Sequence, residues 1–184
     1  MSETFRQTVH LLMGLLGAAI ILRLDDRWAF VFVSAALVVL FLLCDAFTRG
    51  YDVPVLSRVM DESERTGKVP LKGGIAYAPG ALFCLAVFGR EYTAVGLVTV
   101  GVLDSISTLV GLRFGRHTLR GKKSLEGTLA GAAASALALS FLVPWWAAMF
   151  VAAVAGIIEA CFPLDDNVAI QVGVCTTLVG VGVG

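Results

Sequence analysis

Residues 127–158 read GTLAGAAASALALSFLVPWWAAMFVAAVAGII, thirty-two consecutive residues without a charged side chain. A helix needs about 20 apolar residues to cross a bilayer core of roughly 30 Å, so this stretch is too long for one crossing. Pro144 and the two tryptophans after it mark a turn, because proline favours helix starts and tryptophan favours the headgroup level. The stretch therefore predicts two membrane helices joined by a short turn.

Further apolar stretches recur along the whole chain. Of its 184 residues, 58% are apolar and 15% are charged, against about half and a quarter in soluble domains. This composition excludes a water-soluble domain and a disordered chain. The four cysteines lie singly in apolar stretches, which excludes a disulfide framework and a zinc ribbon. We predict an all-α, polytopic membrane protein, a single domain over residues 1–184, with seven spans at 7–23, 28–48, 73–89, 92–113, 126–143, 145–162 and 167–184.

Lysine and arginine set the predicted orientation, because short cytoplasmic loops are enriched in them. Eleven of the fourteen lie at the N-terminus and in two long loops, 49–72 and 113–125. The other three are Arg23, Arg27 and Arg90. We therefore expect the N-terminus, both long loops and the 163–166 turn to be cytoplasmic, and the C-terminus to lie outside.

Three carboxylates lie within predicted spans or at their edges: Asp45, Asp104 and Glu159. Each costs roughly 2.5 to 3.5 kcal/mol near a helix centre, so intramembrane acids indicate function. A position at the interface is an equally good explanation of Asp45. Asp104, nine residues from Arg113, is about 13 Å deep at helical rise, which makes it the strongest functional candidate.

Asp104 belongs to a stripe of small and polar residues at helical spacing, which continues through Ser107, Thr108, Gly111 and Gly115. The last two form a GxxxG pair, which is typical of close helix packing. Close packing and a ligand beside Asp104 are compatible interpretations.

The basic loop after this stripe is the second candidate region. Ser124 is placed to cap the next helix, so Lys122, Lys123 and the free amides of that helix start would converge on a polyphosphate. A lysine at the interface is expected to contribute little to helix packing. The spacing from Gly115 to Lys123 does not fit a P-loop, because five residues separate Gly115 from Gly121 and no strand precedes them.

Weaker signals face the same predicted compartment. Asp165, Asp166 and Asn167 supply three oxygen-bearing side chains near Glu159, which suits Mg²⁺, although capping of the last helix explains one of them. Glu62 and Arg65 lie in an acidic and basic run that is more often only solvated, and His10 alone is more often an interfacial histidine than a catalytic one.

These residues resemble the lipid-alcohol kinases that use cytidine nucleotides: dolichol or polyprenol kinases, phytol kinases and fungal diacylglycerol kinases. The resemblance rests on the run from Asp104 to Gly115 and on Lys123-Ser124-Leu-Glu126-Gly127-Thr128. Arg6, His10, the Glu62–Arg65 run, Glu159 and the Asp165-Asp166-Asn167 turn support it. The chain is similar to the compact prokaryotic or archaeal form of the family.

The resemblance implies transfer of the γ-phosphoryl group of CTP to a membrane lipid alcohol, with Mg²⁺, at the cytoplasmic face. It implies catalytic roles for Asp104, Lys123 and Asp166, and a metal site from Asp104, Glu159, Asp165 and Asp166. The nucleotide-binding residues that it implies are Arg65, Gly111, Gly115, Arg116, Lys122, Lys123, Ser124, Glu126 and Gly127. His10, Asp45, Glu62 and Asn167 would complete the site, and nucleic acid is not expected as a partner.

Two alternatives stay open from the sequence. A CTP-dependent phospholipid cytidylyltransferase carries a similar lysine, serine and glutamate pattern but releases pyrophosphate instead of CDP. A transporter would use intramembrane acids as a relay, but it predicts acids spread through the membrane depth, whereas here they gather near one side.

Overall fold

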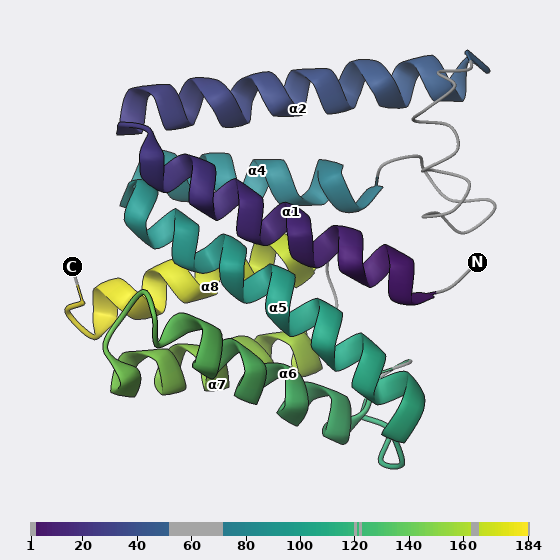
Figure 1. Cartoon of the computed structure of the whole chain (residues 1–184), viewed down its shortest axis with the longest axis vertical. Helices are drawn as coiled ribbons and strands as arrows, with labels where there is room; N and C mark the ends of the chain where they lie inside the picture. The colour runs from purple at the N-terminus through teal and green to yellow at the C-terminus, as the bar shows by residue number, and fades with distance from the viewer. Residues whose placement is uncertain (1–2, 52–71, 120, 122, 163–165, 184) are drawn as a thin grey trace.

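The computed structural model describes residues 3–51, 72–119, 121, 123–162 and 166–183. Within these residues it is all-helical, without a β-strand, and Figure 1 shows the helices as one bundle. The helices are α1 (Glu3–Arg23), α2 (Asp26–Thr48), α4 (Lys72–Phe88), α5 (Arg90–Phe114), α6 (Leu125–Leu139), α7 (Trp145–Cys161) and α8 (Asp166–Gly180).

Each predicted span coincides with one helix, and the largest differences, of four residues, are at the start of α1 and at the ends of α6 and α8. The prediction continued α6 to residue 143, whereas it ends at Leu139. The amides of Leu142 and Val143 both donate to the Leu139 carbonyl, at 2.8 and 3.0 Å, and close a turn before Pro144. The turn between α6 and α7 therefore begins four residues before Pro144, the residue from which the turn was predicted.

Among the described helices, three are long and apolar enough to cross a membrane: α1, α2 and α5. The shorter helices α6 and α8 have 15 residues each, and at 1.5 Å per residue they extend only about 23 Å. Helix α2 is the most exposed of these three helices, since only 6% of its most apolar stretch of 18 residues is buried inside the protein. The exposed apolar surface of α2 is compatible with a membrane protein. Helix length alone supports three of the seven predicted spans.

Helix α5 is the centre of the bundle. Every residue from Thr93 to Leu103 is buried, and α1 and α6 pack closely against it. Glycine makes this approach possible, because a Cβ atom on Gly127 of α6 would lie 2.4 Å from the Ser107 carbonyl oxygen of α5. Figure 1 places α2 along one edge of the bundle and α6 and α7 along the opposite edge.

The ends of the helices gather in two groups, one at each end of the bundle. This is what a chain whose successive helices run in opposite directions requires. Arg90, at the start of α5, donates to the Leu24 carbonyl between α1 and α2, and its amide donates to Asp26 at 3.2 Å. At the other end, Lys123 before α6 reaches Glu159 near the end of α7. Glu3 and Arg6 of α1 line one cavity with Lys123, so the start of α1 and the basic loop share this end of the bundle, and Arg90 lies at the other.

Candidate functional site

A cavity of about 180 Å³ lies at the end of the bundle that carries the basic loop. Four helices and the loop contribute to its wall, so residues distant in the sequence meet there. The lining residues are Glu3, Arg6, Ser107, Thr108, Gly111, Leu112, Lys123, Ser124, Thr128 and Glu159. Of the residues predicted from the sequence, this cavity brings together Gly111, Lys123, Ser124 and Glu159.

The basic loop is held in a defined shape by Glu126. Its carboxylate accepts hydrogen bonds from the backbone amides of Arg116 and His117, and it pairs with the His117 ring at 2.6 Å. Thr118 and Ser124 form an isolated bridge, and Gly121 turns the chain at a φ of 62°, which favours glycine. Glu126 therefore contacts the loop itself, and this contact orders the segment that presents Lys123.

The start of α6 is capped by the protein. The Ser124 hydroxyl accepts from the Gly127 amide at 3.1 Å, while the amides of Leu125 and Thr128 donate to the carbonyls of His117 and Ser124. The predicted Ser124 cap is confirmed, and three of the amides at this helix start are already engaged, by the Ser124 side chain, the Ser124 carbonyl and the His117 carbonyl. An anion here would depend on side chains.

Glu159 is the most buried charged group of the cavity, with 3% of its surface exposed. One of its oxygens, Oε1, accepts from the Ser107 hydroxyl at 2.5 Å and lies 3.8 Å from the Lys123 ammonium. Lys123 also donates to the Glu159 backbone carbonyl at 2.7 Å, which is one of the last four carbonyls of α7. Lys123 therefore both faces the cavity and caps α7.

Three buried polar atoms in the cavity wall lack a hydrogen bond of ordinary length to the described part of the chain: Arg6 Nε, Thr128 Oγ1 and Glu159 Oε2. The last two belong to side chains that interact with each other, so Arg6 Nε is the one that faces no acceptor among the described residues. Arg6 pairs through its other nitrogen with Glu3, one turn earlier on α1. Buried polar groups are normally hydrogen-bonded, so such atoms indicate a missing water, ion or ligand. The three atoms include a donor, a hydroxyl and an acceptor.

Asp104 lies on α5 one turn from Ser107, outside the lining of this cavity. Its carboxylate is 3.4 Å from His10 Nε2 on α1, and the two side chains are 30% and 14% exposed. The His10 ring packs edge-on against Tyr77, at a centroid distance of 5.0 Å, and the Tyr77 hydroxyl donates to the Leu97 carbonyl at 3.0 Å. His10, predicted only as an accessory residue, is therefore a direct neighbour of Asp104.

A metal site is not assembled by the side chains that the structure describes. These contain no group of three histidine, cysteine, aspartate or glutamate side chains close enough to hold an ion. Asp165 and the side chain of Asp166 lie outside the described residues, and so do Lys122, Glu62 and Arg65. Their predicted roles stay predictions.

Some predicted residues are not brought to the cavity. Asp45 pairs with Arg49 of its own helix at 2.9 Å, and both are more than half exposed. Gly115 ends α5, where a Cβ atom would lie 2.7 Å from the Ser124 hydroxyl, so its role is close packing. Arg116 is exposed on the loop and Asn167 lies in the first turn of α8.

Several residues that line the cavity were not among the site residues predicted from the sequence. Ser107 and Thr108 had been placed on the polar stripe, and their spacing to Asp104 was the signal that they face inward. Arg6 and Thr128 had appeared only as supporting matches. Their contribution depends on packing between α1, α5 and α6, which no local pattern encodes.

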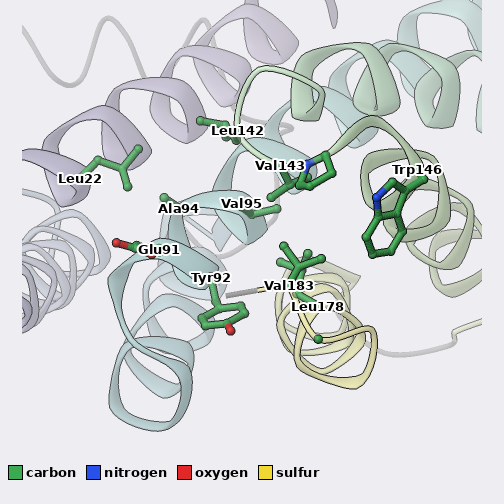
Figure 2. A pocket seen from close by; sticks show the side chains of 12 residues that line it. Leu22, Glu91, Tyr92, Ala94, Val95, Leu142, Val143, Trp146, Leu178 and Val183 are labelled. Atoms are coloured by element: carbon green, nitrogen blue, oxygen red, sulfur yellow. The ribbon is translucent and has the colours of Figure 1, made fainter.

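A second cavity, of about 540 Å³, lies at the opposite end of the bundle. Figure 2 shows aliphatic side chains such as Leu22, Val95 and Leu178 around it, with Trp146 to one side. Glu91 is the one charged residue of its wall. The two cavities therefore differ in chemistry, and only the smaller one joins cationic and anionic groups.

Comparison with known proteins gives one relative of unassigned activity. The chain is 29% identical over 176 residues to the uncharacterized protein MJ1137 of Methanocaldococcus jannaschii, which covers 91% of this chain and 87% of that protein. No family model and no solved structure matches the chain. The similarity extends along nearly the whole of both chains.

Proposed function

We propose that this protein is a membrane-embedded kinase that transfers the γ-phosphoryl group of CTP to a lipid alcohol, with polyprenol or dolichol as the expected substrate. The reaction would take place at the cytoplasmic face, with the N-terminus and the basic loop on that side. A multi-pass arrangement of the seven helices is part of the same proposal.

The observation that carries the proposal is the cavity under the basic loop. A loop ordered by Glu126 presents Lys123 and Ser124 at the same end of the bundle as Arg6 and Asp104. Phosphoryl transfer depends mainly on positioning and on neutralising charge, so cationic side chains beside a partly exposed carboxylate suit it. An alcohol in the surrounding lipid would approach Asp104 from the apolar surface of the bundle.

In the proposed reaction the alcohol oxygen attacks the γ-phosphorus and forms the new O–P bond. The bond from the γ-phosphorus to the bridging oxygen breaks, and CDP leaves. Asp104 accepts the alcohol proton, as a general base does. The His10 ring, whose Nε2 lies 3.4 Å from this carboxylate, would orient it. Mg²⁺ would accompany the nucleotide, and the ligands proposed for it stay Asp104, Glu159, Asp165 and Asp166, of which the last two have side chains outside the described residues.

The test is a transfer assay with purified protein in detergent, using CTP labelled either at the γ- or at the α-phosphorus. Polyprenol, geranylgeraniol, phytol, diacylglycerol and phosphatidic acid are offered separately. A kinase labels the lipid from γ-labelled CTP only and releases CDP. A cytidylyltransferase labels phosphatidic acid from α-labelled CTP and releases pyrophosphate.

Two variants make the assay specific. Asp104→Asn should abolish labelling, whereas Glu91→Gln, a carboxylate change at the opposite end, should leave it unchanged. Label transferred from the α-phosphorus, or from neither position to any alcohol, would reject the kinase proposal.

A further inference from the structure

Tyr77 is buried, with 6% of its surface exposed, and its contacts join three helices. It belongs to α4, its ring contacts His10 of α1, and its hydroxyl donates to the Leu97 carbonyl of α5 at 3.0 Å. A buried phenol hydroxyl normally needs a hydrogen-bond partner, so this bond fixes the outer end of the side chain. Tyr77 is therefore held from α5 while its ring faces α1.

Two glycines form the notch that receives the Tyr77 hydroxyl. A Cβ atom on Gly14 of α1 would lie 2.6 Å from the hydroxyl oxygen, and one on Gly101 of α5 would lie 3.3 Å from it. A side chain at Gly14 would therefore displace the phenol, because the interior has no spare volume there. The backbones of α1 and α5 thus determine where the hydroxyl lies.

The fixed Tyr77 ring restricts rotation of the His10 ring. The two rings meet edge-on, with centroids 5.0 Å apart and planes at 82°, which is an arrangement that aromatic rings prefer. His10 Nε2 then lies 3.4 Å from the Asp104 carboxylate. This distance is just beyond the usual hydrogen-bond range of about 2.7–3.2 Å, so a small rotation of the His10 ring decides whether the two groups bond.

We infer that Tyr77 is a positioning residue, which acts through His10 to hold the Asp104 carboxylate in the orientation that accepts the alcohol proton. The inference rests on the proposed function, because Asp104 is the base only there. Asp104 is 30% exposed, so packing alone does not fix its carboxylate. Loss of this orientation slows the chemical step and leaves nucleotide binding intact, which separates kcat from KM.

The first test is a double-mutant cycle of steady-state transfer with wild type, Tyr77→Leu, His10→Gln and the double variant. Each single substitution should lower kcat about 10- to 100-fold, with KM for CTP within about twofold of wild type. Since Tyr77 acts through His10, the double variant should match His10→Gln within about twofold. A double variant that is slower by the product of the two single effects would overturn the inference.

Two further variants separate positioning from folding. Tyr77→Phe keeps the ring beside His10 and loses only the hydroxyl, so it should retain more of kcat than Tyr77→Leu. It also replaces Tyr77→Leu in the cycle if that variant does not fold. Tyr92→Leu is the matched change at the other cavity and should leave kcat unchanged. Equal losses of kcat from Tyr77→Leu and Tyr92→Leu would contradict a specific role for Tyr77.

A second measurement does not depend on transfer. The chain has two histidines, so in protein with isotope-labelled histidine the His10 ring signal in the NMR spectrum is assigned by comparison with His117→Asn. Asp104→Asn should shift the His10 signal in wild-type protein and leave it in place in Tyr77→Leu, because the ring no longer faces residue 104.

The outcomes separate this inference from the proposed function. A His10 signal that responds equally to Asp104→Asn with and without Tyr77 overturns the inference, whether or not any lipid is phosphorylated. A response that is lost in Tyr77→Leu, in a protein that phosphorylates no lipid, supports the positioning of His10 by Tyr77 and rejects the kinase.

Discussion

Lys123 has a structural contact that its position in the sequence did not indicate. The expectation that it contributes little to packing is wrong, because its ammonium caps α7 at the Glu159 carbonyl and lies near the buried Glu159 carboxylate. We expect Lys123→Ala to abolish transfer and also to destabilise the protein by about 1–3 kcal/mol, since Glu159 loses a charged partner. Thermal unfolding in detergent measures this loss.

The double variant Lys123→Ala/Glu159→Gln is the control for that prediction. It removes the Glu159 charge that Lys123→Ala leaves without its cation, so it should recover part of the lost stability. Unfolding of wild type, the two single variants and the double variant gives the coupling energy between the two side chains. Equal unfolding temperatures of wild type and Lys123→Ala would show that the contact has no energetic role.

Asp104 gives a prediction in which activity and stability separate. The His10 ring nitrogen lies 3.4 Å from its carboxylate. Asp104→Asn preserves shape and removes a charge that is costly within a membrane, so we expect stability to be unchanged or slightly higher. Transfer should fall at least about 100-fold, as expected for loss of a general base. An active but destabilised variant would make Asp104 a structural partner of His10.

At the scale of elements, the contact between α5 and α6 depends on glycine. A Cβ atom on Gly127 would lie 2.4 Å from the Ser107 carbonyl and 3.0 Å from the Gly111 Cα atom, and both belong to backbone that cannot move alone. Gly127→Ala should therefore push α6 away from α5 and cost about 1–3 kcal/mol, with loss of transfer because the cavity wall shifts.

Gly180 provides the matched control for this substitution. It lies at the end of α8, and nothing approaches within 4 Å of the position of its Cβ atom. Gly180→Ala should change the stability by less than about 1 kcal/mol. Similar unfolding temperatures for the two alanine variants would contradict the account of α5 and α6 packing.

For the whole molecule, the distribution of positive charge predicts which end faces the cytoplasm. Single cysteines placed at residues 61 and 118, in a background without the four native cysteines, should be labelled by an impermeant reagent from the cytoplasmic side only. A cysteine at position 141, where the native phenylalanine is 84% exposed in the turn before α7, should be labelled from the outer side. Labelling of 61 and 118 from opposite sides would contradict the helix count between them.

The positions of the described helices could be predicted from the sequence alone. Apolar stretches of limited length, interrupted by charges and by Pro144, are local signals, and each coincides with a helix of the structure. The lengths of the short helices could not be predicted in this way. Helix α6, for example, is shortened by the turn Ser140–Val143, which forms before the proline.

Site residues could be predicted where one helix carries several of them. Asp104, Ser107 and Gly111 lie on one face because of helical spacing, and the structure places the last two in the cavity wall. Arg6 and Thr128 could not be selected this way, since they reach the cavity from two other helices. Asp45 resembled Glu159 in the sequence, yet it lies exposed on α2 and pairs with Arg49.

The sequence by itself determined that the chain forms apolar helices and that eleven of its fourteen lysines and arginines lie at the N-terminus and in two connecting segments, because composition and periodicity act along the chain. Only the tertiary structure decided what each charged group contacts. Glu126 accepts a hydrogen bond from the loop before its own helix, and Lys123 donates to a carbonyl at the end of α7. Glu159 is buried and accepts from Ser107 of another helix. The physical reason is that hydrogen bonds and ion pairs act over a few ångströms in space, and residues such as Ser107 and Glu159, fifty-two positions apart, become neighbours only when glycine lets the helices approach.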